Sequence, residues 1–199
     1  KAGAIKIPHF AHTAYSNCDS SFAEGESYPH LLGKQQLFEH FHEKTYDVQL
    51  EKYLHDVQQR PDLLIRTKRL YALEFQCSRI PIELIEKRTN GYKERGIIPV
   101  WLPKTPTVPI YPGKILKSSF DIFYQQFMNQ HTVITYDPFK QQFVYFCHCL
   151  YLHGNLFLSE VRVLSLASQV FPFYRPKPLC EKQFQMMFNQ YSDYRKKYL

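Results

Sequence analysis

Two short apolar runs joined by a polar turn constrain the fold of this chain more than any other feature. The runs RPDLLIR and RLYALEFQCS are rich in Leu, Ile, Tyr and Phe, and the polar stretch from Arg66 to Arg69 separates their apolar parts. This pattern predicts two antiparallel strands closed by a tight turn. The second strand then carries Glu74 and Gln76 among apolar neighbours, and a carboxylate in such a place needs a partner.

The segments around this hairpin extend it to an α/β core. GESYPHLLGKQQLFEHFHE has helical spacing, with Ser27 as its cap and Pro29 in its first turn, and YDVQLEKYL alternates as a strand does. A second helix is expected from Pro81 to Gly96, and the apolar run IIPVWL after it predicts a buried strand. The predicted order is helix, three strands, helix, strand.

The remainder of the chain has a different pattern. Prolines recur every third residue from Pro103 to Pro112, the period of polyproline II, which predicts an extended connector, a surface strap or a proline-rich peptide ligand. Beyond it, SSFDIFYQQFMNQ and EKQFQMMFNQYSDYRKKYL have helical spacing, and HTVITY and QFVYFCHCLYL suggest a hairpin. We expect an N-terminal segment at residues 1–21, the α/β domain at 22–103, the connector at 104–116 and a mainly helical region at 117–199.

Charge and cysteine content indicate which partners the chain binds and in which cellular compartment it acts. The net charge of +7 favours a polyanionic partner such as nucleic acid or a membrane surface, although a basic solvated surface fits it as well. The apolar runs are shorter than the ~20 residues of a membrane span and no signal peptide is recognisable, so we expect a soluble protein. Five cysteines without the spacing of a disulfide framework favour the cytoplasm. The absence of an initiator Met indicates a fragment or a processed chain.

The predicted hairpin brings two acids together. With residues 66–69 as the turn, Asp62 lies opposite Leu73 or Glu74. Paired carboxylates and a main-chain carbonyl suit Mg²⁺ or Mn²⁺, and such a site permits hydrolysis of a phosphodiester. The alternative is that Asp62 is only a turn residue and that Glu74 forms an ion pair with Arg66 or Arg69.

These residues resemble a known signature. Pro61-Asp62, eleven further residues and Glu74-Phe75-Gln76 resemble the PD-(D/E)xK nuclease motif with glutamine in place of lysine. The longer string RPDLLIR...YALEFQCSRIPIELIEKRTNGYKERGIIPVWLP, preceded by KIPHFAH and ESYPHLLGK, resembles the competence protein CoiA family over about residues 5–103. The resemblance implies a restriction-endonuclease-like core and a divalent-metal-dependent deoxyribonuclease. It would process transforming DNA, as single strands, during uptake and recombination.

The resemblance also assigns roles to residues of the hairpin. Asp62 and Glu74 would be ligands of Mg²⁺ or Mn²⁺, and Phe75 would lend its main-chain carbonyl. Gln76 occupies the position of the usual lysine, where an amide can position a water but supplies no positive charge. Glutamine occurs there in active branches of the superfamily too, so the change does not by itself imply an inactive protein.

The first helix supplies three further candidates. Glu26, His30 and Lys34 match the family pattern ES-x-x-H-x-x-x-K. Lys34 could restore the charge that Gln76 lacks, and Glu26 would lie near the metal. His30 would be a general acid or a phosphate contact, or else an ordinary surface or capping histidine.

The second helix and its approach supply candidates for DNA binding. Arg88 and Tyr92 are one helical turn apart and could reach a phosphate or a base, as could Arg79, although plain solvation fits Arg88 equally. On the strand before the hairpin, Glu51 could orient a ligand or a water. A buried ion pair with Arg60 explains it nearly as well.

Cysteines and aromatic residues raise two further sites. Cys147 and Cys149 would share a strand face with Tyr145 and Tyr151, with His153 and Cys180 in reach, which raises a zinc site, although buried thiols fit better without a C-x-x-C pair. Family members often carry a zinc-ribbon-like module before KIPHFAH. Aromatic and basic residues alternate in YSDYRKKYL and could stack on single-stranded bases, or fill a core and a solvated tail.

Two functions besides a nuclease stay open from the sequence. A catalytically inactive module that binds single-stranded DNA or mediates recombination would explain Gln76. A structure-specific junction resolvase would require a dimer and branched DNA. Recombination proteins are expected partners of either, and the sequence leaves the oligomeric state open.

Overall fold

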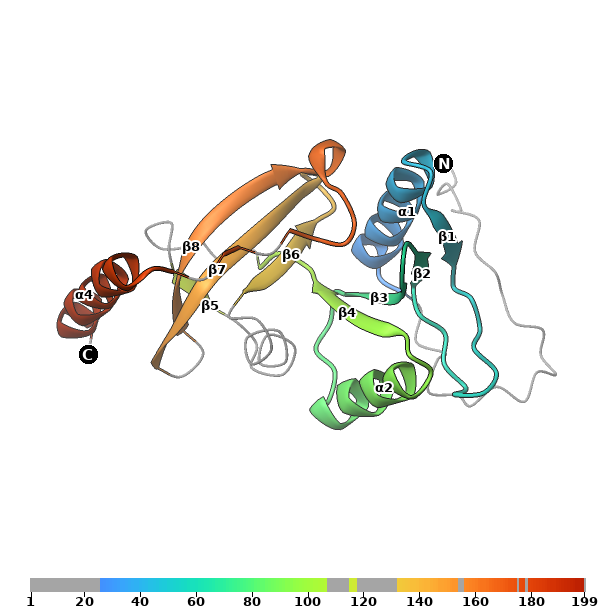
Figure 1. The fold of residues 1–199 in the computed structure, drawn as a ribbon, viewed down its shortest axis with the longest axis horizontal. Coiled ribbons are helices and arrows are strands. Elements are labelled where there is room, and N and C mark those ends of the chain that lie inside the picture. Colours follow the sequence, from blue (N-terminus) through green and yellow to red (C-terminus); the bar gives the residue numbers. More distant parts are fainter. Residues whose placement is uncertain are drawn as a thin grey trace, which may run out of the picture.

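The part of the chain described by the structure, a computed structural model, is built around two four-stranded sheets (Figure 1). That part comprises residues 26–106, 115–117, 132–153, 156–174, 176–177 and 179–198. The predicted N-terminal segment lies outside it, as do most of the prolines expected in the connector. None of the helices within these ranges has the length and apolar character needed to cross a bilayer.

The first sheet is the predicted α/β core, with the strand order β1-β2-β3-β4. Its elements are α1 (Tyr28–Glu43), β1 (Asp47–Leu50), β2 (Leu63–Arg66), β3 (Leu70–Gln76), α2 (Ile82–Glu94) and β4 (Ile98–Pro103). β1 pairs with β2 and β2 pairs with β3 in antiparallel orientation, and β4 pairs with β3 in parallel orientation. The predicted order of helix, three strands, helix and strand is confirmed, as is the short turn between β2 and β3.

The two helices cover opposite faces of this sheet because the side chains of β3 alternate. Leu73 and Phe75 face α1, where they pack in one core with Leu37 and Phe41. Glu74 faces α2 instead. α1 approaches β3 closely at Gly33, where an added Cβ would lie 2.2 Å from the Phe75 ring, so glycine is required for this packing.

The second sheet overturns the prediction that residues 117–199 are mainly helical. Within the described ranges, this region holds the antiparallel order β5-β8-β7-β6, a short 3₁₀ turn and one α-helix. The elements are β5 (Ile115–Lys117), β6 (Val133–Asp137), β7 (Gln142–His153), β8 (Leu156–Ser165), η2 (Leu166–Ser168) and α4 (Glu181–Tyr198). The predicted β6–β7 hairpin and the terminal helix are confirmed, and the expected helix SSFDIFYQQFMNQ lies outside the described residues.

A β-bulge in β7 overturns the prediction that Cys147 and Cys149 share one face of the strand. His148 has a positive φ of 53° and the β7–β8 register shifts between Cys147 and Leu150. Cys147 therefore packs in the core beside α1 while Cys149 packs in a separate cluster with Phe146. Both are buried free thiols, and burial raises the pKa of Cys149 to about 12. The sequence raised a zinc site here but favoured buried thiols, and buried thiols are what these two residues are.

The two sheets share one hydrophobic core. Lys104, directly after β4, forms a parallel bridge with Tyr136 of β6, and the Tyr136 ring packs 5.8 Å from that of Phe75. The Tyr136 hydroxyl donates to Gln36 Oε1 of α1 at 2.8 Å. The second sheet therefore supports the α1 face of the first, directly behind Phe75.

Candidate active site

Asp62 lies where the β2–β3 ladder ends and its side chain takes the place of a ladder acceptor. Its Oδ2 accepts a hydrogen bond from the Phe75 amide at 2.7 Å. The register that pairs Leu63 with Leu73 places Asp62 opposite Glu74, as predicted. The carboxylate is thus fixed against β3 by a main-chain donor.

The Phe75 carbonyl has an unusual position in the ladder. Gln76 accepts from Lys104 on the β4 side, so the main-chain groups of Phe75 point to the β2 side, where the register places Pro61 opposite. Proline has no N–H, so Pro61 cannot donate to the Phe75 carbonyl as another residue would. This gives the Pro61-Asp62 pair a physical purpose: it leaves a main-chain oxygen beside a carboxylate.

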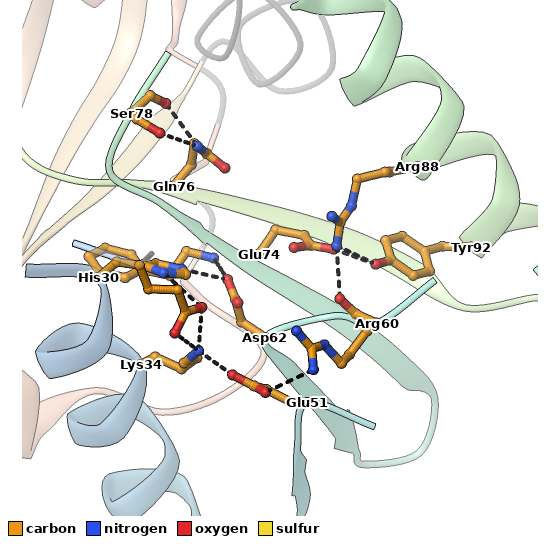
Figure 2. A network of polar contacts seen from close by, with 12 residues as sticks. His30, Lys34, Glu51, Arg60, Asp62, Glu74, Gln76, Ser78, Arg88 and Tyr92 are labelled. Carbon is orange, nitrogen blue, oxygen red and sulfur yellow. Dashed lines mark hydrogen bonds and ion pairs between the residues drawn. The ribbon is translucent and has the colours of Figure 1, made fainter. Parts of the chain in front are cut away.

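Glu74 is held from the α2 side in a buried environment. Its Oε1 accepts from Arg88 at 2.5 Å and from the Tyr92 hydroxyl, and Arg88 also donates to the Arg60 carbonyl at 2.9 Å (Figure 2). Burial raises the pKa of Glu74 to about 7; Arg88 opposes the shift and Asp62 adds to it. The ion pair expected with Arg66 or Arg69 is wrong, since the partner is Arg88 and Arg66 pairs with Asp47.

Arg88 and Tyr92 therefore contact a carboxylate and are not plain surface residues. The alternative of simple solvation is wrong for Arg88, whose side chain is 17% exposed. Burial would lower its pKa, but Glu74 and Tyr92 raise it instead. DNA contact by these two residues stays a prediction, as it does for Arg79, which is exposed between β3 and α2.

The α1 side holds a chain of alternating charges, as Figure 2 shows. His30 places Nε2 3.2 Å from Asp62 and Nδ1 3.2 Å from Glu26. Burial would lower the pKa of His30, but its bonds to Asp62 and Glu26 raise it to about 9. Hydrogen bonding to His30, helped by Lys34, lowers the pKa of Glu26 to about 2 against the effect of burial. His30 is therefore an imidazolium at neutral pH and no ordinary surface or capping residue.

Lys34 is buried between two carboxylates. Its ammonium donates to both oxygens of Glu26, at 2.6 and 2.7 Å, and to Glu51. Burial would lower its pKa, but these bonds raise it. Glu51 also pairs with Arg60 at 3.4 Å, which was the alternative explanation of this residue, although the pair is partly exposed and not buried. The contact with Lys34 was not foreseen. The helical spacing of Glu26, His30 and Lys34 made their gathering predictable.

The side chain of Gln76 is bonded to the loop after β3 and not to the acids. Its side-chain amide donates to the Ser78 carbonyl at 2.9 Å and to the Ser78 hydroxyl at 3.2 Å (Figure 2). In this rotamer the amide satisfies the loop after β3. It supplies no charge to the acids, and Lys34 is the ammonium that lies near Asp62, whose charge raises the pKa of that lysine.

The donors at this site suit a divalent cation. Asp62, Glu74 and the Phe75 carbonyl are oxygen ligands of the kind that Mg²⁺ and Mn²⁺ prefer. The hydrogen bonds that reach Glu74 from described residues end on Oε1. A second group, Glu26, His30 and Asp62, brings its ligand atoms within 4.8 Å of one another and shares Asp62 with the first.

Comparison with known proteins places this site in a class and a family. Residues 26–175, which include both sheets and every site residue named above, match the family model described as "Competence protein CoiA, nuclease-like domain". The matched residues thus form a domain of a nuclease-like class. The chain is a member of the competence protein CoiA family.

One curated relative supports this membership. The chain is 34% identical over 189 residues to competence protein CoiA of Bacillus subtilis (strain 168), across 89% of this chain and 49% of the relative. The chain thus spans about half the length of the relative that it matches. No solved structure matches the chain.

Proposed function

We propose that this chain is a divalent-metal-dependent deoxyribonuclease with a restriction-endonuclease-like core, acting in the cytoplasm on transforming DNA. The observation that carries the proposal is the Asp62 carboxylate bonded to the Phe75 amide beside Glu74 at the end of the β2–β3 ladder. The element order of the first sheet and the nuclease-like family support it.

Asp62, Glu74 and the Phe75 carbonyl would hold Mg²⁺ or Mn²⁺. Such an ion lowers the pKa of a bound water and neutralises charge on a phosphoryl oxygen. Burial raises the pKa of Glu74 to about 7, which means that its ionised form is destabilised. A bound cation would stabilise that form. Arg88 and Tyr92 hold Oε1, which fixes the direction of the carboxylate.

The α1 side would supply positive charge and a proton. Lys34, paired with Glu26 and Glu51, would stabilise charge on the phosphate in place of the lysine missing at Gln76. His30 remains protonated up to pH about 9 and has N–H groups at both ring positions. It would donate to a phosphate oxygen or protonate the leaving oxygen.

Cleavage of end-labelled single- and double-stranded DNA with Mg²⁺, Mn²⁺ or EDTA tests this proposal. We expect metal-dependent cleavage that Asp62→Asn and Glu74→Gln each abolish, with DNA binding retained. Glu86→Gln, on the exposed face of α2, is the matched control and should cleave as the wild type does. Cleavage that survives both site substitutions would refute the assignment.

A second candidate is a catalytically inactive DNA-binding or recombination module. The observation that favours it is the Gln76 amide, which is uncharged and bound to Ser78. This candidate predicts binding of single-stranded DNA with no cleavage by either metal. The same experiment therefore separates the two functions.

A further inference from the structure

Two large aromatic side chains lie side by side on the surface where the two sheets meet. Tyr28, the first residue of α1, is 56% exposed, and Phe139, in the turn between β6 and β7, is 60% exposed. Their ring centroids are 6.3 Å apart with an angle of 39° between the planes. Neighbouring exposed aromatic rings from two distant segments are characteristic of a binding surface.

The turn that carries Phe139 fixes this ring outward. Asp137 Oδ1 accepts from the amides of Phe139 and Lys140, at 3.0 and 3.2 Å. Gln141 closes the turn with a positive φ of 51°. Side-chain bonds of this kind define a turn locally, so the exposure of Phe139 follows from the turn.

Cations flank the two rings. Lys104 places Nζ 5.7 Å from the centroid of the Phe139 ring, within the range of a cation–π contact. Lys140 is the next residue in the turn, and its side chain is 73% exposed. Its Nζ lies 4.0 Å from Asp137 Oδ2. The surface therefore combines apolar ring faces with positive charge, which suits a ligand that has flat bases and phosphates.

This surface adjoins the candidate active site through the chain itself. The Lys104 amide donates to the Gln76 carbonyl at 2.8 Å, and Tyr28 begins α1 two residues before His30. Tyr136, three residues before Phe139, packs on Phe75.

We propose that Tyr28 and Phe139 form a stacking subsite for an unpaired base of single-stranded DNA, with Lys104 and Lys140 beside its phosphates. The inference rests on the proposed function in that DNA is the ligand. A base in a duplex is stacked on both faces and cannot offer one to these rings, whereas an unpaired base can. The subsite therefore selects single strands over duplexes.

Binding of the full chain to a single-stranded oligonucleotide that contains 2-aminopurine tests the subsite without cleavage. Anisotropy and 2-aminopurine quenching are measured in EDTA and again in Ca²⁺. We expect Phe139→Ala and Tyr28→Ala each to weaken single-strand binding about tenfold and to reduce quenching, with little change for a duplex. Phe139→Leu should behave as Phe139→Ala, and Phe139→Tyr as the wild type, because the flat ring is what binds.

A matched control lies on the second sheet. Tyr174 is 44% exposed and has Arg162 5.8 Å from its ring, so it repeats the pairing of ring and cation on the β7–β8 side. Tyr174→Ala should bind as the wild type does. Thermal melting of each variant checks that the fold is retained.

The outcomes separate this inference from the nuclease proposal. Unchanged single-strand affinity in Phe139→Ala and Tyr28→Ala, equal losses for single strands and duplexes, or a wild type that binds no single strand in either buffer overturns the subsite. If the wild type cleaves DNA but Phe139 is indifferent, only the subsite fails. If binding depends on Phe139 and nothing is cleaved, the subsite stands and the nuclease fails.

Discussion

The two sides of the acidic pair differ in how they hold charge. The α1 side links its groups in a partly exposed chain in which carboxylates and cations alternate, formed by Glu26, His30, Lys34, Glu51, Arg60 and Asp62. The α2 side buries a single carboxylate, Glu74, against one cation and one phenol. One side offers several charges to a ligand, while the other fixes the direction of one group.

The pKa values of two glutamates express this difference. Hydrogen bonding to His30 lowers the pKa of Glu26 to about 2, whereas burial raises that of Glu74 to about 7 in spite of Arg88. The surroundings therefore stabilise the ionised form of Glu26 on the α1 side and destabilise the ionised form of Glu74 on the α2 side. A buried carboxylate of this kind is costly for the fold and would be relieved by a cation, which is why we propose Glu74 as a metal ligand.

Removing the cation of the α2 side should have the largest effect on stability. Arg88→Ala leaves Glu74 buried without its ion pair, and we expect the free energy of unfolding to fall by about 3 kcal/mol. Urea unfolding in EDTA measures it, with Lys87→Ala, exposed on the same helix, as the control. The double variant Arg88→Ala with Glu74→Ala should lose less than the sum of the two single losses. Additive losses would contradict the pairing.

Pushing α1 away from β3 should have the next largest effect on stability. A Cβ at Gly33 would lie 2.2 Å from the Phe75 ring, which is 1% exposed and cannot move freely. Gly33→Ala should lower the free energy of unfolding by about 2 kcal/mol through overpacking, despite the better helix propensity of alanine. Phe75→Leu in the same chain should recover part of the loss. A stabilised Gly33→Ala variant would show that α1 lies farther from β3.

Removing the phenol of the α2 side should have a smaller effect. Tyr92→Phe deletes the hydroxyl that donates to Glu74 Oε1 and keeps the ring in the core. One lost hydrogen bond lowers the free energy of unfolding by about 1 kcal/mol. Denaturant unfolding checks it. A loss as large as that of Arg88→Ala would mean that the phenol and not the guanidinium carries the pairing.

The α1 side should show a modest dependence of stability on pH. The pKa of His30 is raised from 6.5 to about 9, so its contribution is complete below pH 6.5 and is lost as the pH rises through about 9. That of Glu26 is lowered from 4.5 to about 2, so its contribution is complete above pH 4.5 and is lost as the pH falls through about 2. In EDTA, the melting temperature of the wild type should therefore fall more between pH 6 and 9 than that of His30→Gln. Parallel curves would contradict the bonds of His30.

The hairpin and its acids could be predicted from the sequence, because register in a short hairpin is local. Residues 66–69 fixed the turn, and period-two alternation then separated Glu74 from Phe75. The partner of Glu74 could not be predicted in the same way. Arg88 comes from a different element, and the signal that could have pointed to a distant partner is that no acid lies one helical turn from it.

The second sheet shows where sequence patterns fail. β7 was predicted as part of a hairpin, but the strand β8 after it was not, and the helix-like spacing of the segments around them suggested a helical region. The bulge at His148 depends on a backbone conformation that tertiary packing selects. It separated Cys147 from Cys149, which strict alternation would have kept on one face.

The most direct test of the central claim is the binding of Mn²⁺ to the full chain, measured by isothermal titration calorimetry. If Asp62 and Glu74 share one ion, Asp62→Asn and Glu74→Gln should each weaken Mn²⁺ binding by at least about tenfold. Glu39→Gln, an exposed acid on α1, should leave the affinity unchanged. Mn²⁺ binding that is the same in the wild type and in both site variants would contradict the account.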